Sequence, residues 1–348
     1  MSSPQLYMQR ALDLAARGLG KVRPNPLVGC VIVHDDLVTG EGWHQQYGGP
    51  HAEVMAIENV SDKKLLNKST VYVTLEPCAH HGKTPPCVDL LISYGVPRVV
   101  VAQRDPNPVV DGGGIKKLQD AGFEVVIGVL ESEAVELNKR FHCYVKNKRP
   151  FIVLKWAATT ESNGHPGFIA KENYDSKWIS NAYSRKLVHQ WRAEEAAVLV
   201  GTNTAHFDNP KLNVRGWLGL DPIRIVIDKN LRLAPELHLF SDDNPTLCYN
   251  LSKEQQLGSV SWVQLPEKDF MAGLFYDLYQ RGIQSVLVEG GAALHETLLD
   301  KHLWDEIRVF KANKKFGSGI EAPYPQGKRV STQKIQDDIL THYRRVNG

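Results

Sequence analysis

The chain has 348 residues, enough for two domains of ordinary size, and 42% of the residues are hydrophobic and 23% charged. These fractions are typical of globular proteins and exclude a disordered, collagen-like or fibrous chain. The formal net charge is only +2, from 41 basic and 39 acidic residues. The sequence as a whole therefore has no attraction for a phosphate backbone, and nucleic acid is not the expected partner.

The cysteines predict a reducing compartment. There are five of them, and an odd number at scattered positions does not suit a disulfide framework. The amino-terminal segment has no continuous apolar stretch, so no signal peptide is expected. The longest apolar runs are far shorter than the roughly 20 residues that span a bilayer. A soluble cytoplasmic protein with no membrane partner is expected.

Short apolar runs alternate with helical patterns in the first part of the chain. An amphipathic helix is predicted over 5–17 and a charged helix over 131–144. Between them lie predicted strands at 28–34, 70–76, 97–103 and 123–129, and predicted helices at 52–60, 88–95 and 114–122. Repeated strand–helix alternation predicts an α/β layer fold with parallel strand pairs.

A basic stretch closed by proline, VKNKRP (145–150), is the predicted boundary between domains 1–146 and 150–348. The alternation restarts after it. Strands are predicted at 151–157, 196–201, 223–229 and 284–291, helices at 180–194 and 268–282, and a late strand with its exit at 303–317. Two α/β units therefore follow one another along the chain.

One histidine and two cysteines have the spacing of a metal site. Glu53 follows His51 by two residues, and the later segment TLEPCAHHGKTPPC carries Cys78 and Cys87. One imidazole and two thiolates leave one tetrahedral position of zinc open, as a catalytic site requires. His51 and Glu53 reach one centre only at a helix start, which the preceding Gly-Gly-Pro (48–50) predicts.

These residue types suit the hydrolytic deamination of a ring amine. Zinc lowers the pKa of a bound water, and a carboxylate such as Glu53 carries the proton. Zinc nucleobase deaminases combine His-x-Glu with Pro-Cys-x₂-Cys, whereas this chain has eight residues between the cysteines. One alternative is a structural zinc site with His80 or His81 as fourth ligand; another is that the cysteines are core residues only.

Residues 4 to about 145 resemble the deaminase half of the bifunctional riboflavin-biosynthesis deaminase–reductase family. The matching segments are MQRALDLAARGLGKVRPNPLVGCVIV, GWHQQYGGPHAE, TLEPCAHHGKTPPCVDLLI and RDPNPVVDGGG. The resemblance implies a cytidine-deaminase-like three-layer α/β/α domain, with zinc on His51, Cys78 and Cys87 and with Glu53 as proton shuttle. It also implies a substrate pocket lined by Asn25, His44, Lys83, Asp105 and Asn107, residue types that equally suit turns or solvated surface.

The second half contains no Gly-x-Gly-x-x-Gly fingerprint for a dinucleotide. Glycine turns follow two predicted strands instead, at Gly201 to Thr204 and at Glu289 to Gly291. Their N–H groups are able to cradle phosphates, although a glycine turn alone is weak evidence.

The same half resembles the reductase domain of that family, which has a dihydrofolate-reductase-like α/β fold. The matching stretches are IVLKWA, NYDSKWIS, HQWRAEEAAVLVGTNTAHFDNPKLNVR, PIRIVID, SVLVEGGAALHETLL and KFGSG. The resemblance implies a ribosyl-phosphate site formed by Lys155, Ser176, Arg192, Leu212, Arg215 and Glu289. It implies NADPH as cofactor, bound by Ala158, Trp178, Thr204, Asp208 and Gly291.

One stretch departs from the family. Its members commonly carry Asp-Gly shortly after the Lys-x-x-Ala strand, whereas here the stretch 159–167 is longer and no Asp precedes either glycine. Glu161 or Asn163 is the candidate to replace that Asp. The departure leaves the local substrate and cofactor contacts open, and with them the second activity.

The two motif sets predict a bifunctional enzyme for a small phosphorylated pyrimidine. The predicted reactions are zinc-dependent deamination of 2,5-diamino-6-ribosylamino-4(3H)-pyrimidinone 5′-phosphate, then NADPH-dependent reduction of the ribosyl chain to ribityl. The alternatives are a nucleic-acid deaminase, which needs a basic groove with aromatic residues, and a zinc-stabilised binding protein, which has no use for Glu53. Whether the chain forms a homo-oligomer is left open.

Overall fold

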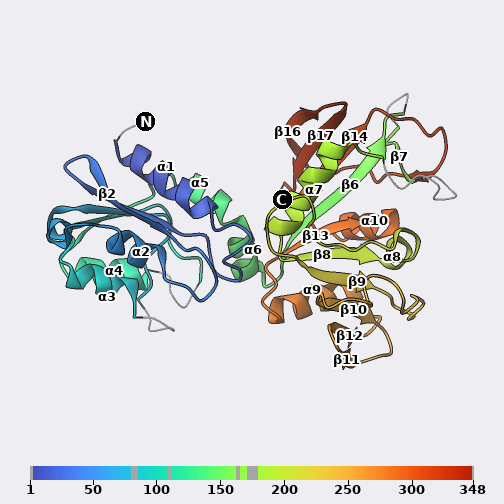
Figure 1. Ribbon diagram of the computed structural model, residues 1–348, viewed down its shortest axis with the longest axis horizontal. Helices are drawn as coiled ribbons and strands as arrows, with labels where there is room; N and C mark the ends of the chain where they lie inside the picture. Colours follow the sequence, from blue (N-terminus) through green and yellow to red (C-terminus); the bar gives the residue numbers. More distant parts are fainter. Residues whose placement is uncertain (1–2, 80–84, 108–111, 162–164, 171–178, 347–348) are drawn as a thin grey trace. The chain divides into compact units, whose positions relative to one another are not determined.

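The computed structural model of the chain describes residues 3–79, 85–107, 112–161, 165–170 and 179–346. The chain divides into two units, 1–148 and 149–348, and each has its own sheet (Figure 1). Within the described ranges, no helix combines the length and the apolar character needed to cross a membrane.

A five-stranded sheet forms the centre of the first unit, in the order β2-β1-β3-β4-β5. Its strands are β1 (Gly29–His34), β2 (Leu37–Trp43), β3 (Thr70–Val73), β4 (Arg98–Val101) and β5 (Glu124–Ile127). β1 pairs antiparallel with β2 and β3, whereas β3, β4 and β5 run parallel. The carboxyl ends of β3 and β4 therefore lie at the same edge of the sheet.

Helices cover both faces of this sheet, because successive strand residues point to opposite sides. Cys30 and Ile32 pack with α2, α3 and α4, while Val31 and Val33 pack with α1 and α5. Figure 1 shows these two helix groups on opposite sides of the sheet. The bounds are α1 (Ser3–Ala16), α2 (Ala52–Glu58), the 3₁₀ helix η1 (Lys63–Lys68), α3 (Cys87–Ser93), α4 (Gly113–Asp120), α5 (Glu131–Leu137) and α6 (Lys139–Asn147). The expected three-layer α/β/α arrangement is confirmed.

The single charged helix predicted over 131–144 is wrong, because α5 ends before Asn138 and α6 begins after it. The Asn138 side chain is buried and pairs with the backbone of Leu27. Its Oδ1 accepts the Leu27 N–H at 2.8 Å, and its Nδ2 donates to the Leu27 carbonyl at 2.8 Å. This tertiary pairing fixes the residue in a non-helical conformation, which the charge pattern does not reveal.

The second unit contains a ten-stranded sheet in the order β11-β12-β10-β9-β8-β13-β6-β14-β17-β16. The strands from β12 to β14 in this order run parallel, and the remaining pairs are antiparallel. The bounds are β6 (Phe151–Thr159), β8 (Ala197–Gly201), β9 (Ile223–Ile227), β10 (Thr246–Asn250), β11 (Gln255–Leu257), β12 (Val260–Gln264), β13 (Ser285–Gly290), β14 (Glu306–Ala312), β16 (Lys328–Ile335) and β17 (Asp338–Arg344). A separate pair joins β7 (Phe168–Ala170) to β15 (Ile320–Glu321).

Helices cover both faces of this sheet too. Its four described helices are α7 (Ala182–Glu194), α8 (Thr202–Asp208), α9 (Phe270–Gln280) and α10 (Ala292–Asp300). Val309 of β14 belongs to the core that α9 and α10 share. The next residue, Phe310, points the other way and stacks on Trp191 of α7, with ring centroids 5.4 Å apart. The mixed α/β class predicted for this half is confirmed.

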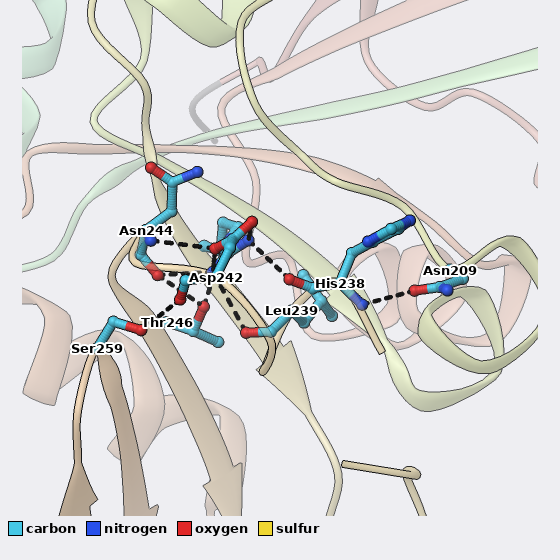
Figure 2. Close-up of polar contacts among 8 residues, drawn as sticks. Asn209, His238, Leu239, Asp242, Asn244, Thr246 and Ser259 are labelled. Carbon is cyan, nitrogen blue, oxygen red and sulfur yellow. Dashed lines mark hydrogen bonds and ion pairs between the residues drawn. The ribbon is translucent and has the colours of Figure 1, made fainter. Parts of the chain in front are cut away.

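A buried guanidinium group connects β9 to the segment that leads into β10. Arg224 of β9 is only 1% exposed. It donates to Thr246 Oγ1 at 2.9 Å, to Asp242 Oδ2 at 3.0 Å, and to the carbonyl oxygens of His238, Leu239 and Asn244. Figure 2 labels these five partners. The network ties the segment before β10 to β9.

Replacing Arg224 with methionine is expected to destabilise the second unit by about 3 kcal/mol, because three buried or partly buried carbonyl groups and Asp242 lose this donor. Calorimetric unfolding of the whole chain measures this. Arg329→Met in the exposed strand β16 is the matched control and should cost less than about 0.5 kcal/mol. Equal effects of the two substitutions would contradict the assigned role of Arg224.

Candidate functional site

The three predicted metal ligands lie together where two helices begin. His51 is the N-cap residue of α2, and Cys87 is the first residue of α3. The His51 Nδ1 and the sulfur atoms of Cys78 and Cys87 all lie within 4.8 Å of one another. Nδ1 is 3.2 Å from the Cys87 sulfur and 3.6 Å from the Cys78 sulfur. A triangle of one imidazole nitrogen and two sulfurs at these separations has the dimensions of a tetrahedral zinc site with one open position.

The two thiols support that assignment. The pKa of Cys78 is lowered to about 4 by hydrogen bonds from Cys87 and His51, including the Cys87 backbone N–H at 3.3 Å. The same pairing, together with burial, raises the pKa of Cys87. Protein groups alone therefore stabilise one thiolate of the pair, and a divalent cation is what allows both to ionise. The donor set fits zinc.

Glu53 lies in the first turn of α2, beside this triangle, and is only 3% exposed. Burial raises the pKa of its carboxyl group, as does the neighbouring Cys78, while its contact with Cys87 opposes the rise. A carboxyl group with a raised pKa holds a proton more readily than an ordinary glutamate does, which suits a group that takes up and releases protons. Such a group beside an open metal position suits acid–base chemistry on a bound water.

Asn25 and His44 form a hydrogen-bonded pair next to His51. The buried His44 ring lies with Nδ1 2.9 Å from the Pro50 carbonyl oxygen, so Nδ1 carries the proton and donates. Nε2 then accepts from the Asn25 side-chain amide at 3.0 Å. Burial lowers the pKa of His44, which keeps the ring neutral. The ring stands edge-on to His51, with centroids 5.9 Å apart, so the pair borders the metal cluster.

Asp105 and Asn107 lie in the segment that follows β4. The Asp105 carboxylate accepts the Asn107 N–H at 2.8 Å, which is the turn that their sequence suggests. The Asp105 N–H donates to Glu76, two residues before Cys78, at 3.3 Å. This contact links the segment to the metal site. Lys83, His80 and His81 lie outside the described residues.

Three charged residues predicted for the second site meet at the end of β13. Arg192 of α7 binds Glu289 through both carboxylate oxygens, at 2.5 and 2.8 Å. Lys155 Nζ of β6 lies 3.8 Å from the same carboxylate. Burial acts to raise the pKa of Glu289, but Arg192 and Lys155 outweigh it and lower the value to about 2. Glu289 is therefore an anion at neutral pH, and burial lowers the pKa of Lys155 beside it.

Arg215 and Leu212 join this cluster through Asn213. The Asn213 carbonyl accepts from Arg192 Nη1 at 3.0 Å, and its side-chain oxygen accepts from Arg215 Nη1 at 2.9 Å. Leu212 is buried with φ 51°, a backbone conformation that costs a leucine about 1 kcal/mol. The Arg192 donors thus have protein partners, whereas Arg215 is exposed. Arg215 is the better placed of the two for a ligand phosphate.

The predicted glycine turns lie at the switch point of the parallel strands. β8 continues through α8 to β9 on one side, while the adjacent β13 continues through α10 towards β14 on the other. Ligands of open parallel sheets bind where connections diverge in this way. The Thr204 hydroxyl lies against Gly290 and Gly291, where an added Cβ would come within 3.0 and 3.1 Å of it. A backbone cradle at the start of α10 suits a dinucleotide phosphate.

The structure gives less information on the other residues predicted for this site. Asp208 ends α8 and interacts electrostatically with Lys155. Ala158 of β6 is fully buried. Ser176, Trp178 and Asn163 lie outside the described residues.

The Glu161 side chain stabilises the segment in which it lies. Its carboxylate accepts from the Thr159 hydroxyl and from the Phe316 N–H, both at 2.9 Å. Thr160 adds bonds to the Lys314 and Ala312 carbonyls. The unusual stretch is thereby anchored to the segment after β14.

Sequence reasoning did not single out three residues of these sites: Glu76, His189 and Asn213. Glu76 lies inside a motif that was used only for Cys78. His189 precedes Arg192 by one helical turn, and burial, Arg192 and Arg215 lower its pKa to about 4. Its Nδ1 lies 3.2 Å from the Asn213 carbonyl oxygen and 3.3 Å from the Arg215 backbone nitrogen. The i, i+3 spacing with Arg192 is a signal that could have indicated His189.

Comparison with known families assigns both units. Residues 1–103 match the cytidine and deoxycytidylate deaminase zinc-binding region, and residues 150–345 match the RibD C-terminal domain. The riboflavin biosynthesis protein RibD of Aquifex aeolicus is 40% identical, over 97% of this chain and 98% of that protein. The RibD protein of Escherichia coli is 38% identical, over 97% and 98%.

Solved structures agree with these matches. The deaminase/reductase of Thermotoga maritima has a TM-score of 0.90 at 39% identity, and Acinetobacter baumannii RibD has 0.89 at 34%. Each comparison covers 99% of both chains. The family predicted from the sequence is confirmed, and with it the cofactors zinc and NADPH. This chain belongs to the RibD family of riboflavin biosynthesis, and it is a bifunctional enzyme with a zinc-binding deaminase domain and a reductase domain.

Proposed function

We propose that the chain performs two successive reactions on one small phosphorylated pyrimidine. Residues 1–146 deaminate 2,5-diamino-6-ribosylamino-4(3H)-pyrimidinone 5′-phosphate, and residues 150–348 reduce the ribosyl chain of the product to ribityl. The Thermotoga relative is called a diaminohydroxyphosphoribosylaminopyrimidine deaminase / 5-amino-6-(5-phosphoribosylamino)uracil reductase, which supports this choice. The observation that carries the proposal is the buried Glu53 beside the three ligand atoms of His51, Cys78 and Cys87.

In the deaminase domain, His51, Cys78 and Cys87 hold the metal and Glu53 moves the protons. Bound zinc supplies a water of lowered pKa. Glu53 takes one proton from the attacking water and delivers it to the ring nitrogen. It then carries the second proton of that water, from the hydroxyl group now bonded to the ring carbon, to the amino group, which leaves as ammonia. The substrate contacts proposed here are Asn25, His44, Lys83, Asp105 and Asn107. The pairing of His44 with Asn25 supports this, because it fixes the orientation of the Asn25 amide beside the metal cluster.

In the reductase domain, the chain orients the substrate against the cofactor. NADPH bound there would supply the hydride that C1′ of the opened, imine-like ribosylamine needs. The proposed cofactor contacts are Ala158, Trp178, Thr204, Asp208 and Gly291. The proposed substrate contacts are Lys155, Ser176, Arg192, Leu212, Arg215 and Glu289. The exposed Arg215 binds the phosphate, while Arg192 and Lys155 hold Glu289 as an anion beside it.

The remaining assignments follow from this substrate. No nucleic acid takes part, and the site of action is the cytoplasm, as the cysteine usage predicts. The described cysteines are all free thiols, which agrees with a reducing compartment.

Glu53→Gln is expected to retain zinc and to lose deamination by at least about a hundredfold, because the amide cannot carry the proton. The assay supplies the diaminopyrimidine ribosyl phosphate with NADPH and records ammonia release and NADPH oxidation together. The unaltered chain should show both, and a zinc chelator should stop ammonia release. Ammonia release at a near-normal rate in the variant would rule out the role of Glu53. Ammonia without NADPH oxidation in the unaltered chain would remove the second activity from the proposal.

Cys87→Ser is expected to bind less than about a tenth of the wild-type zinc, because a serine hydroxyl does not ionise to form a third strong ligand. Elemental analysis of the purified protein measures the content. Cys143→Ser changes a buried thiol of the same domain outside the cluster and should leave the zinc content unchanged. Full zinc in Cys87→Ser would show that the metal is held elsewhere.

Arg215→Ala is expected to raise the reductase KM about thirtyfold, which corresponds to about 2 kcal/mol for one lost charge-assisted contact. The deaminated pyrimidine is the varied substrate, and kcat should change less than KM. Arg329→Ala, on the exposed strand β16, serves as control. An unchanged KM in Arg215→Ala would remove this residue from the phosphate site.

A further inference from the structure

Glu76 is a buried acidic residue that the proposed mechanism does not use. It lies three residues after the end of β3 and two residues before Cys78, and it is only 4% exposed. A carboxyl group in such a place is costly unless its oxygens accept hydrogen bonds. Its partners therefore indicate what it does.

All four recorded partners of the Glu76 carboxylate are backbone N–H groups. Oε1 accepts from Gly114 at 2.9 Å and from Ile115 at 3.1 Å. Oε2 accepts from Gly112 at 3.2 Å and from Asp105 at 3.3 Å. One side chain thus joins the beginning of α4 to the segment that leaves β4.

The first two of these bonds serve a helix that has no cap of its own. α4 begins at Gly113, and its N-cap residue Gly112 has no side chain. The N–H groups of a first helical turn lack acceptors inside the helix, and an anion there gains from the helix dipole. Glu76 supplies that carboxylate from the segment that follows β3.

The backbone around Glu76 is held equally closely. Its own N–H donates to the Gln103 carbonyl at 3.0 Å, at the end of β4. Gly114 lies directly against the Pro77 carbonyl, and a Cβ at this position would collide with it. The two residues before Cys78 and the start of α4 are therefore in contact at both the side-chain and the backbone level.

We propose that Glu76 is a positioning residue for the deaminase substrate. It fixes Asp105 relative to the segment that carries Cys78. The hydrogen bond from the Asn107 N–H to the Asp105 carboxylate then fixes Asn107 relative to the same segment. This inference rests on the proposed function, which gives Asp105 and Asn107 to the substrate. Glu76 touches neither substrate nor metal, so its effect appears in substrate binding rather than in zinc content.

The test is Glu76→Gln in the full-length, zinc-loaded enzyme. The variant keeps the size of the side chain but replaces one acceptor oxygen with an NH₂ group, so two of the four backbone donors lose their partner. The deaminase KM should rise about tenfold with a smaller change in kcat. Zinc content and reductase activity should stay unchanged. Hydrogen exchange should become faster at the amides of Asp105 and of residues 112–115.

A helix cap without a positioning role would give a different result. If Glu76 only caps α4, Glu76→Gln would lower the thermal stability of the domain and speed hydrogen exchange in α4, but leave KM within twofold of wild type. This outcome would overturn the inference. Glu58→Gln, at an exposed position of α2, is the matched control. If Glu76→Gln loses zinc, Glu76→Asp, which retains the charge, is compared in the same way and should show the same rise in KM.

The two hypotheses fail in different ways. A normal rate in the unaltered enzyme together with an unchanged KM in the variant overturns the role of Glu76 alone. No deamination by the unaltered enzyme overturns the proposed function and this inference with it.

Discussion

The first turn of a helix leaves backbone N–H groups without acceptors, and both candidate sites are arranged around such turns. In the first unit, His51 is the N-cap residue of α2, Glu53 lies in the first turn of that helix, and Cys87 begins α3. In the second unit, α8 and α10 begin directly after β8 and β13, at Gly201 and Gly291. The partial positive charge of these turns favours thiolate, carboxylate and phosphate alike. One backbone feature therefore supports two unrelated chemistries.

The second constraint is that a buried charge needs partners of opposite sign, and Glu289 shows this most clearly. Arg192 and Lys155 lower its pKa to about 2 from an ordinary value of 4.5, although burial alone would raise it. Because the folded-state pKa is depressed, the ionised carboxylate contributes stability that is complete above pH 4.5 and is lost as the pH falls towards 2. The same pairing occupies the Arg192 guanidinium. For the phosphate contact proposed above, this favours the exposed Arg215, which no carboxylate of the described residues holds in an ion pair.

Apolar runs indicated most of the buried strands but not β10, which is buried at all five positions. Two motif sets indicated the family and most candidate residues. What the sequence did not reveal depends on contacts between distant segments. β2 was missed because it contains Gly40 and Gly42, where a Cβ would collide with the backbone of α2. β16 is exposed along almost its whole length and shows no alternation. The contacts of Glu76 and Asn138 are to backbone groups, which carry no residue-type signature, so no pattern of side chains predicts them.

The position of β6 in its sheet has a consequence for folding during synthesis. β6 is the first strand of the second unit to be made, yet its neighbours are β13 and β14, which follow more than a hundred residues later. Pairings of such long range form slowly because a large loop must close first. The most distant bond recorded within the first unit, from Leu27 to Asn138, is satisfied once residue 138 has left the ribosome. On a ribosome the deaminase half can thus complete its core early, while the backbone N–H and C=O groups along both edges of β6 stay unpaired until most of the chain has emerged.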